Sequence, residues 1–472
     1  MQTAVYQDVQ VSLYQGDCLD VLREFSDESL DAVVTDPPAG IGFMGKEWDS
    51  DKGGRDQWIA WLTKIMREVF RVMKPGAHAL VWALPRTSGW TSRALEDAGF
   101  EVRDRVSHVF GSGFPKSKNV SEAVVDRLGA KRKVLGRRPG MIGSVHRVVT
   151  DEKGKRSSAD AVPVTEAVTR EAKEWDGFGT ALKPAMEDWW LARRPLRETV
   201  SHSAISYGVG GLNIDASRVG DAGGPTGIGS DGSGLFGVGG STVVPLDAGR
   251  WPANLVLSKC GPECGMTCTS DCSVALLDKQ SGASRPTRTV VKPRGMGYAG
   301  SNEPVGGVAG HNDEGGASRF FHCFEPDADP FFYAPKPSRA ERERGLKDAK
   351  IKEKTVGMLG MDETSDQVAR FMKTVRNTHP TVKSQRLMQY LVKLVTPPGG
   401  TVLDCFAGSG STLVAAKALG FRAIGVEREE EYCKIIAGRV AAIETREALR
   451  RPVSDRLRRL TEKKIDMRRS RK

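Results

Sequence analysis

A short apolar run that ends in an acid and two prolines constrains the fold of this chain more than any other stretch. Residues 30–35, LDAVVT, are followed by Asp36, Pro37 and Pro38. Proline fixes φ and has no N–H to donate to a sheet, so the strand that this run predicts must end at once. We therefore expect a buried strand whose exit, just beyond Asp36, has a rigid backbone.

Further apolar runs alternate with helical patterns on both sides of the middle of the chain. Residues 10–16 and the run AHALVWAL predict strands, and residues 55–72 have apolar side chains at the spacing of an amphipathic helix. Near the C-terminus, residues 383–395 predict a helix, TVLDC a strand, residues 412–419 a helix and RAIGVE a strand. Strands that alternate with helices of this length indicate a parallel α/β sheet.

The middle of the chain lacks this alternation. Residues 116–193 are charged and mixed, with a helix expected over 164–174, and fourteen of the 44 residues from 207 to 250 are glycine without a three-residue repeat. Such a glycine-rich stretch cannot bury much apolar surface, so we expect loops there. The simplest organisation is one α/β domain that is interrupted by residues 121–330.

Composition excludes several classes of protein. Of the 472 residues, 39% are hydrophobic and 27% are charged, which is typical of a soluble globular protein. The sequence has no apolar run of membrane-spanning length and no basic-then-apolar start, so we expect a cytoplasmic protein without a membrane partner. Eight cysteines in a chain of this kind indicate reduced thiols or metal ligands rather than a disulfide framework.

The charge of the chain favours a polyanionic partner. The net charge is +11, and residues 450–472 hold eleven Lys or Arg against three acids. This tail is interpreted either as a solvated helical extension or as an arm that contacts phosphates.

The second chemical signal is the run TVLDCFAGSGSTLVAAKALGFRAIGVE. Gly408 and Gly410 let the backbone approach a ligand, and the following helix offers free N–H groups to an anion. Glu427 ends the next strand, where an acid can accept hydrogen bonds from ribose hydroxyls. Leu413 stands where a dinucleotide fingerprint would need its third glycine. The pattern therefore fits a nucleoside that carries a carboxylate better than it fits a dinucleotide.

Together, DPPAG and LDCFAGSGST resemble the catalytic and cofactor motifs of S-adenosylmethionine-dependent DNA amino-methyltransferases, and their order resembles the β group of that family. GDCLDVL, FRVMKPGAHALVWA and HPTVKSQRLMQYLVKLVTPPGG are also similar to family motifs. The resemblance covers about residues 10–120 and 330–440. It implies an α/β fold: a Rossmann-like methyltransferase sheet with helices on both faces, interrupted by a large loop-rich insertion.

By this resemblance, residues 1–120 form the catalytic half of the methyltransferase domain and residues 331–445 the cofactor-binding half. Residues 121–330 are then the probable target-recognition region and residues 446–472 a basic tail. The implied partner is double-stranded DNA. A homodimer and a paired restriction nuclease are both left open, as is the recognition sequence.

The resemblance implies S-adenosyl-L-methionine as cofactor. Glu427 would bind its ribose, Asp17 its adenine amine, and Thr381 with Lys383 its methionine end. Asp17 could equally be a helix N-cap. Ser411 and Thr412 would meet the cofactor carboxylate. The full set of implied cofactor residues is Asp17, Cys18, Thr381, Lys383, Asp404, Phe406, Ala407, Gly408, Gly410, Ser411, Thr412 and Glu427.

The implied catalytic residues are Asp36, Pro37 and Pro38. A nucleobase amine is a poor nucleophile, and it needs acceptors for its two N–H groups. The Asp36 carboxylate can supply one acceptor and the Pro37 carbonyl another, held by the paired prolines. No metal is needed, because the sulfonium is already a good leaving group. An acid at the first position favours adenine N6, with cytosine N4 as the alternative.

Ala39 departs from the family, which usually has an aromatic ring there to stack on the flipped base. We expect a ring from the same glycine-rich loop, Phe43 or Trp48, to replace it, with Phe43 favoured. The missing ring also motivates an alternative function, a DNA-binding protein that has a methyltransferase fold and no activity.

Four cysteines recur at one spacing in CGPECGMTCTSDC: Cys260, Cys264, Cys268 and Cys272. Four thiolates suit tetrahedral zinc, although the cluster is more compact than a usual zinc ribbon. Structural zinc and free thiols in a loop are both kept as hypotheses.

Overall fold

The computed structural model describes most of the α/β core and parts of the middle of the chain. The described residues are 3–110, 117–139, 148–150, 156–158, 161–220, 249–259, 272–284, 289–291, 307–309, 314–324, 339–346, 352–355 and 372–443. The basic tail and residues 221–248 of the glycine-rich stretch lie outside them. No helix among the described residues combines the length and the apolar character needed to cross a membrane.

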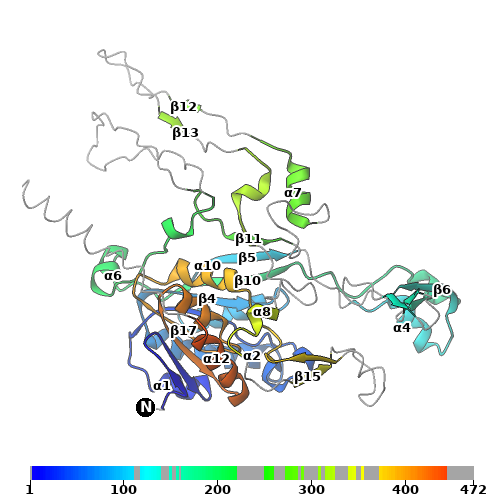
Figure 1. Cartoon of the computed structure of the whole chain (residues 1–472), viewed down its shortest axis with the longest axis horizontal. Helices are drawn as coiled ribbons and strands as arrows, with labels where there is room; N and C mark the ends of the chain where they lie inside the picture. The colour runs from blue at the N-terminus through cyan, green and yellow to red at the C-terminus, as the bar shows by residue number, and fades with distance from the viewer. Residues whose placement is uncertain are drawn as a thin grey trace, which may run out of the picture.

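One ten-stranded sheet organises the chain (Figure 1). Its strands, in spatial order, are β1 (Tyr6–Gln7), β2 (Val11–Gln15), β18 (Arg422–Glu427), β17 (Thr401–Asp404), β3 (Leu30–Thr35), β4 (Met73–Ala83), β10 (Met186–Arg193), β5 (Glu101–Phe110), β11 (Leu255–Ser258) and β14 (His322–Phe324). The strands from β2 to β4 pair in parallel, whereas β10 runs antiparallel to both β4 and β5. The predicted α/β class is confirmed.

Helices cover both faces of this sheet. On one face, α1 (Cys18–Arg23), α2 (Arg55–Val72) and α3 (Ser88–Asp97) pack on side chains such as Val33 and Val81. The other face is covered by α10 (Gln385–Val395), α11 (Ser411–Ala418) and α12 (Glu430–Ala441). The alternating side chains of each buried strand therefore enter two separate hydrophobic cores.

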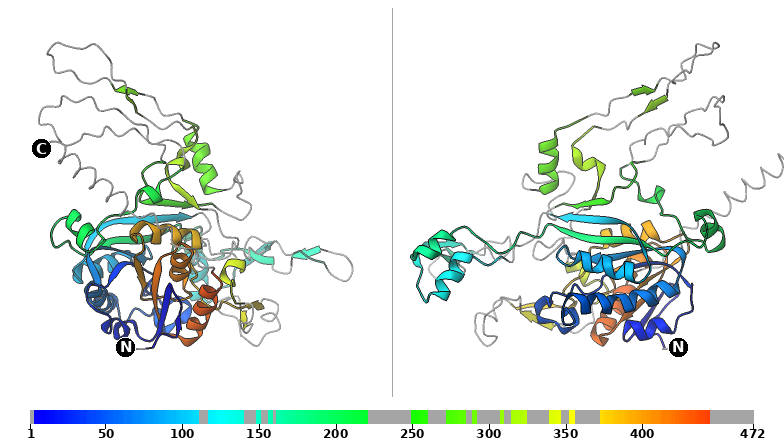
Figure 2. Two further views of the ribbon diagram at one scale, coloured as in Figure 1. Left: turned by 60° about the vertical axis from the view of Figure 1, so that its left-hand side comes forward. Right: turned by 180° about the vertical axis from the view of Figure 1, so that it is seen from behind.

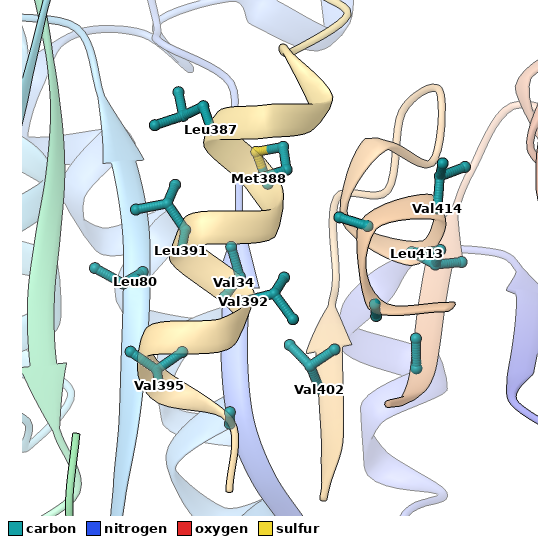
Figure 3. Close-up of a cluster of buried hydrophobic side chains, with 14 of the residues drawn as sticks. Val34, Leu80, Leu387, Met388, Leu391, Val392, Val395, Val402, Leu413 and Val414 are labelled. Carbon is teal, nitrogen blue, oxygen red and sulfur yellow. The ribbon is translucent and has the colours of Figure 1, made fainter. Parts of the chain in front are cut away.

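The helix α10 is the centre of the second core (Figure 3). Leu387, Leu391 and Val395 recur at helical spacing and are at most 2% exposed. They face Leu80 of β4 and, with Val392, lie over Val34 and Val402 of two neighbouring strands (Figure 3). This packing keeps β3, β4 and β17 in one rigid layer, on which the functional site is built.

Several element boundaries agree with the sequence patterns. The helix α2 and the strands β3 and β18 begin and end at the predicted residues, and all six residues of β3 are buried. The helix predicted over 164–174 is partly wrong. The strand β9 (Ala161–Glu166) occupies its first residues, and only α5 (Arg170–Glu174) is helical.

Residues 121–330, which interrupt the α/β pattern of the sequence, contribute strands to the same sheet. This segment supplies β10, β11 and β14, and β10 lies between β4 and β5 in the middle of the sheet. Its register pairs Leu191 with Leu80 of β4 and with Asp104 of β5. The sequence pattern misses β10 because both of its neighbours come from far away in the chain.

Along the sequence, the chain between β5 and β10 forms a projecting arm (Figure 2). It contains α4 (Val120–Arg127), β6 (Lys133–Pro139), β9 and α5, with a small core around Val125 and Ala172. At its base the two chain segments meet, because the Lys118 N–H donates to Thr180 Oγ1 at 2.9 Å and the Thr180 N–H to Ser117 Oγ at 2.8 Å.

The remaining elements are short. They are the helices α6 (Val200–Ser206), α7 (Ser273–Ser281) and α8 (Arg339–Arg342), and the strand pairs β7 (Val148–Thr150) with β8 (Arg156–Ser158), β12 (Thr289–Val291) with β13 (Gly307–Ala309), and β15 (Lys352–Thr355) with β16 (Met372–Val375).

Candidate functional site

The site lies where the direction of the chain connections across the sheet reverses. From β17 the chain passes through α11 to β18 on one side, whereas from β3 it passes through α2 to β4 on the other. Because β17 and β3 are neighbours, a crevice opens at their carboxyl ends, where α/β sheets bind ligands. A cavity of about 940 Å³ occupies this place.

Almost every predicted site residue lines this one cavity. The lining includes Asp17, Cys18, Asp36, Pro37, Pro38, Phe43, Trp48, Thr381, Lys383, Asp404, Phe406, Ala407, Gly408, Ser411, Thr412 and Glu427. Gly410 lies just behind it, at the N-cap of α11. Two groups of residues more than 300 positions apart in the sequence therefore share one cavity.

Asp36 follows β3 directly and faces a lysine. Its Oδ2 lies 3.3 Å from Lys383 Nζ, and its side chain is 21% exposed. Burial raises the pKa of Asp36 to about 7; Lys383 opposes this rise, whereas Glu187 and Asp404 add to it. Lys383 thus lies beside Asp36, and its predicted role at the methionine end of a cofactor remains a prediction.

The backbone after Asp36 is held from several directions. Pro37 is buried, and the Thr87 hydroxyl donates to the Ala39 carbonyl at 2.9 Å. Gly40 has φ +71°, and a Cβ at this position would lie 2.6 Å from Trp58 Nε1. Only glycine fits there. The rigid exit predicted from the paired prolines is therefore reinforced by tertiary contacts.

Asp404 borders the cavity, and both of its carboxylate oxygens accept hydrogen bonds. Its Oδ1 accepts from the Thr35 hydroxyl at 2.7 Å, and its Oδ2 accepts from the Thr412 hydroxyl at 2.6 Å. The Phe406 N–H also donates to Oδ1. Burial raises the pKa of Asp404, while these bonds oppose the rise. Both Asp404 and Thr412 therefore brace β3, β17 and α11 against one another.

The glycine turn brings the backbone close to the cavity. Gly408 has φ +55°, and a Cβ there would lie 2.8 Å from His379 Nε2. Ser411, in the first turn of α11, is 7% exposed. Its hydroxyl has no hydrogen-bond partner among the described residues. A buried hydroxyl without a partner, beside free helix N–H groups, suits a carboxylate ligand.

Glu427 closes the same turn from the end of β18. Its Oε2 accepts from the Gly408 N–H at 2.7 Å and its Oε1 from the Glu429 N–H at 2.9 Å. Burial raises the pKa of Glu427 to about 7, against the lowering effect of these backbone bonds. The acid therefore holds the glycine turn in place while facing the cavity.

The remaining residues of the predicted cofactor set are mostly apolar. Asp17 caps α1 by accepting from the Leu19 N–H at 2.9 Å, which is the N-cap alternative, while it also borders the cavity. Cys18 and Ala407 are buried, and Phe406 packs against Trp61 with ring centroids 5.9 Å apart. They supply an apolar wall for a ring-shaped ligand.

Both candidate stacking rings lie on the loop that follows Ala39. Asp49 holds this loop, because its carboxylate accepts from the N–H groups of Gly40 at 3.0 Å and Phe43 at 2.7 Å. The Trp48 ring lies nearly parallel to His379, at 17° and 6.5 Å between centroids. Phe43 and Trp48 both border the cavity. That one of these rings replaces the aromatic side chain missing at Ala39 therefore stays a prediction for both residues.

The cysteine cluster falls largely outside the described residues. Cys260, Cys264 and Cys268 are not among them, and Cys272 is buried beside Leu257 and Val274. Within the described part of the chain, no group of His, Cys, Asp or Glu is arranged to hold a metal ion. Structural zinc at these cysteines stays a prediction.

Glu187, Trp82 and His108 are among the cavity residues that the sequence pattern did not indicate. Glu187 Oε2 accepts from Trp82 Nε1 at 3.0 Å, and burial lowers the pKa of His108 to about 4. The sequence offered one signal for Glu187, because acidic residues are unusual in an apolar run such as MEDWWLAR. His108 and Trp82 could not be found in this way, because buried strands often contain such residues.

Comparison with known proteins agrees with this geometry. Residues 322–438 match the family described as DNA methylase. The type II methyltransferase M.BamHI of Bacillus amyloliquefaciens is 23% identical over 194 residues, which are 40% of this chain and 41% of that protein. The type II methyltransferase M2.DpnII of Streptococcus pneumoniae is 36% identical over 92 residues, 20% of this chain and 34% of its own length. Part of this chain is therefore similar to DNA methylases and to type II methyltransferases.

The aligned stretches span less than half of each of these two relatives. Among solved structures, a cytosine-N4-specific PvuII DNA methyltransferase aligns over 93% of this chain and 89% of its own, with 13% identity and a TM-score of 0.39. The M1.HpyAVI–SAM complex aligns over 91% and 98%, with 13% identity and a TM-score of 0.35.

Proposed function

We propose that this chain belongs to the DNA amino-methyltransferases and is a site-specific DNA methyltransferase that transfers a methyl group from S-adenosylmethionine to the exocyclic amine of a flipped base, with adenine N6 favoured over cytosine N4. One observation carries the proposal. The Asp36–Pro37 exit of β3 and the glycine turn of β17 line the same cavity, so an amine and a methyl donor can meet there.

The residues present fit S-adenosylmethionine. The Ser411 hydroxyl without a partner and the first N–H groups of α11 can hold the methionine carboxylate. Glu427 borders the cavity, where its carboxylate can accept hydrogen bonds from ribose hydroxyls, and the apolar wall of Cys18 and Phe406 suits a purine ring. When bound, this cofactor supplies a methyl group on a sulfonium, which leaves readily as a neutral thioether.

The chain itself supplies the acceptors for the target amine. The Asp36 carboxylate accepts one N–H and the Pro37 carbonyl the other, so that the lone pair of the nitrogen turns toward the methyl group. As the N–C bond forms, the amine becomes acidic, and ionised Asp36 can take the proton that it loses. With the pKa of Asp36 raised to about 7, transfer should slow as the pH falls below that value.

The direct test is to express the chain in cells that lack DNA methylation. We expect mass spectrometry of the nucleosides to detect N6-methyladenine, and sequencing to place it at one recognition site. N4-methylcytosine instead would correct the base assignment. A folded protein that binds S-adenosylmethionine and DNA, yet leaves no methylated base, would contradict methyl transfer and favour the inactive DNA-binding alternative.

Removing the acceptor should separate chemistry from binding. We expect Asp36→Ala to lower kcat by at least about a hundredfold, because its hydrogen bond strengthens in the transition state. The affinity for S-adenosylmethionine should stay within about threefold of the parent value. Asp56→Ala, which removes an exposed carboxylate on α2, is the control. Full activity of Asp36→Ala in a methyl-transfer assay would refute the assigned role.

A further inference from the structure

A buried lysine lies between two acids at the wall of the cavity. Lys383 Nζ lies 3.3 Å from Asp36 Oδ2 and 3.5 Å from Glu187 Oε2. The side chains of Lys383 and Glu187 are only 10% and 8% exposed. Because water screens such a group poorly, the charges of Lys383 and Glu187 both act on Asp36.

Aromatic side chains hold this group in place. The Lys383 ammonium lies 3.8 Å from the centroid of the Trp82 ring, a cation–π distance. The same Trp82 donates from Nε1 to Glu187 Oε2 at 3.0 Å. Three elements therefore meet here: β4 brings Trp82, β10 brings Glu187, and the segment before α10 brings Lys383. Such a pre-organised arrangement leaves the lysine little freedom to move.

Two other titratable groups near Asp36, Asp404 and His108, have fixed partners or no charge. Both oxygens of Asp404 accept hydrogen bonds from Thr35 and Thr412. His108 is the register partner of Glu187 on β5, and with its pKa lowered to about 4 it is neutral at physiological pH. The charge balance at Asp36 is therefore set mainly by Lys383 and Glu187, with Asp404 as a fixed neighbour.

We propose that Lys383 and Glu187 are a positioning pair, in which Lys383 anchors Asp36 Oδ2 and Glu187 draws part of the lysine charge away. This inference rests on the proposed function and extends it. With Oδ2 anchored, Oδ1 is left to accept from the target amine. Without Glu187, Asp36 would form a full ion pair with Lys383. It would then be a weaker hydrogen-bond acceptor, because a full ion pair withdraws charge from the carboxylate. Lys383 favours the ionised form of Asp36, and Glu187 leaves more of the negative charge on the Asp36 carboxylate by drawing on the lysine charge.

The two members of the pair must then shift the ionisation of Asp36 in opposite directions. Lys383 favours the charged carboxylate, so Lys383→Met should move the acidic limb of the kcat/KM profile upward by about half a pH unit or more. Glu187 disfavours it, so the isosteric Glu187→Gln should move that limb downward. A purely structural role would change the rate without shifts of opposite sign.

Two further variants serve as controls in this test. Lys383→Arg retains the charge and should keep the acidic limb near its parent position. Lys417→Met removes another buried ammonium, which lies 2.7 Å from Asp8 outside the cavity, and should not move the limb. If Lys383→Met fails to fold, Lys383→Arg and Glu187→Gln still decide, because only Glu187→Gln should shift the limb.

A readout without turnover separates this inference from the proposed function. NMR of protein labelled with ¹³C at the aspartate carboxyl groups can follow Asp36, whose signal is identified by its loss in Asp36→Asn. We expect Asp36 to titrate near 7 in the parent, higher in Lys383→Met and lower in Glu187→Gln. Shifts of the same sign, or no shift, would overturn the pair even if the parent transfers methyl groups. Absence of methyl transfer, by contrast, would overturn the proposed function alone.

Discussion

At the scale of single residues, Ser411 and Thr412 show how neighbouring hydroxyls in one motif acquire different roles. Thr412 donates to Asp404 and is committed to the fold. Ser411 is buried with a hydroxyl that has no partner in the described part of the chain. Unpaired buried polar atoms are costly, so their persistence favours a role in binding a ligand.

We expect this difference to appear in the affinity for S-adenosylmethionine. Ser411→Ala should weaken binding severalfold, and Glu427→Ala by about tenfold or more, because Glu427 also holds the Gly408 N–H. Thr412→Val should leave the affinity nearly unchanged but lower the free energy of unfolding by about 1–3 kcal/mol, since Asp404 loses a buried donor. Calorimetry and thermal unfolding measure the two effects. No binding by the parent protein would refute the cofactor assignment.

At the scale of elements, the loop after β3 combines a rigid backbone with half-buried aromatic rings. Asp49 and Thr87 fix its backbone near Ala39, whereas Phe43 and Trp48 face the cavity. The small Ala39 side chain leaves space that a ring from this loop could use. Stacking of a base on an aromatic ring is worth about 1–3 kcal/mol.

If a ring of this loop replaces the missing aromatic, its removal should slow methylation of duplex DNA. We expect Phe43→Ala or Trp48→Ala to lower turnover at least tenfold, which corresponds to about 1.4 kcal/mol. Phe43→Leu and Trp48→Leu are matched controls, because leucine retains apolar bulk without a flat face. Equal activity of each Leu variant and its parent would indicate a loop anchor rather than a stacking ring.

At the scale of the whole molecule, the chain leaves and re-enters its core sheet more than once. The arm between β5 and β10 has its own small core around Val125, and its two ends meet at Lys118 and Thr180. Next to the arm, the chain segments of β5 and β10 are joined by a hydrogen bond, which the Phe110 N–H donates to the Ala185 carbonyl at 2.9 Å. The arm is therefore separable from the cavity.

We expect a short Gly-Ser linker in place of residues 118–180 to preserve binding of S-adenosylmethionine within about twofold, since none of the described residues in this range lines the cavity or joins the core sheet. Recognition of a specific DNA site should be lost if the arm belongs to the target-recognition region. Footprinting on DNA, together with calorimetry, tests both expectations. Unchanged site specificity would place recognition elsewhere.

The cysteine cluster gives a second prediction at this scale. If Cys260, Cys264, Cys268 and Cys272 bind zinc, the purified protein should contain about one metal ion per chain. A chelator should then loosen the middle of the chain at a lower temperature than the α/β sheet. Elemental analysis and limited proteolysis measure these effects, and a protein without metal would favour free thiols.

The predictable part of the site lies within short stretches of the sequence. The strand β3 and the prolines after it, and the glycine turn between β17 and α11, are specified locally by apolar runs and chain breakers. Glu187 was missed because its role depends on β10 pairing between two strands from another part of the chain.

The sequence by itself thus determined the α/β class, the chemical character of the two strand ends and the resemblance to a methyltransferase, because each depends on neighbouring residues. Only the tertiary structure decided which acid faces Lys383, that Asp404 and Thr412 bind each other, and that residues 186–193 enter the core sheet. These facts depend on contacts between distant segments, and the energy of such contacts is set by burial and register rather than by local pattern.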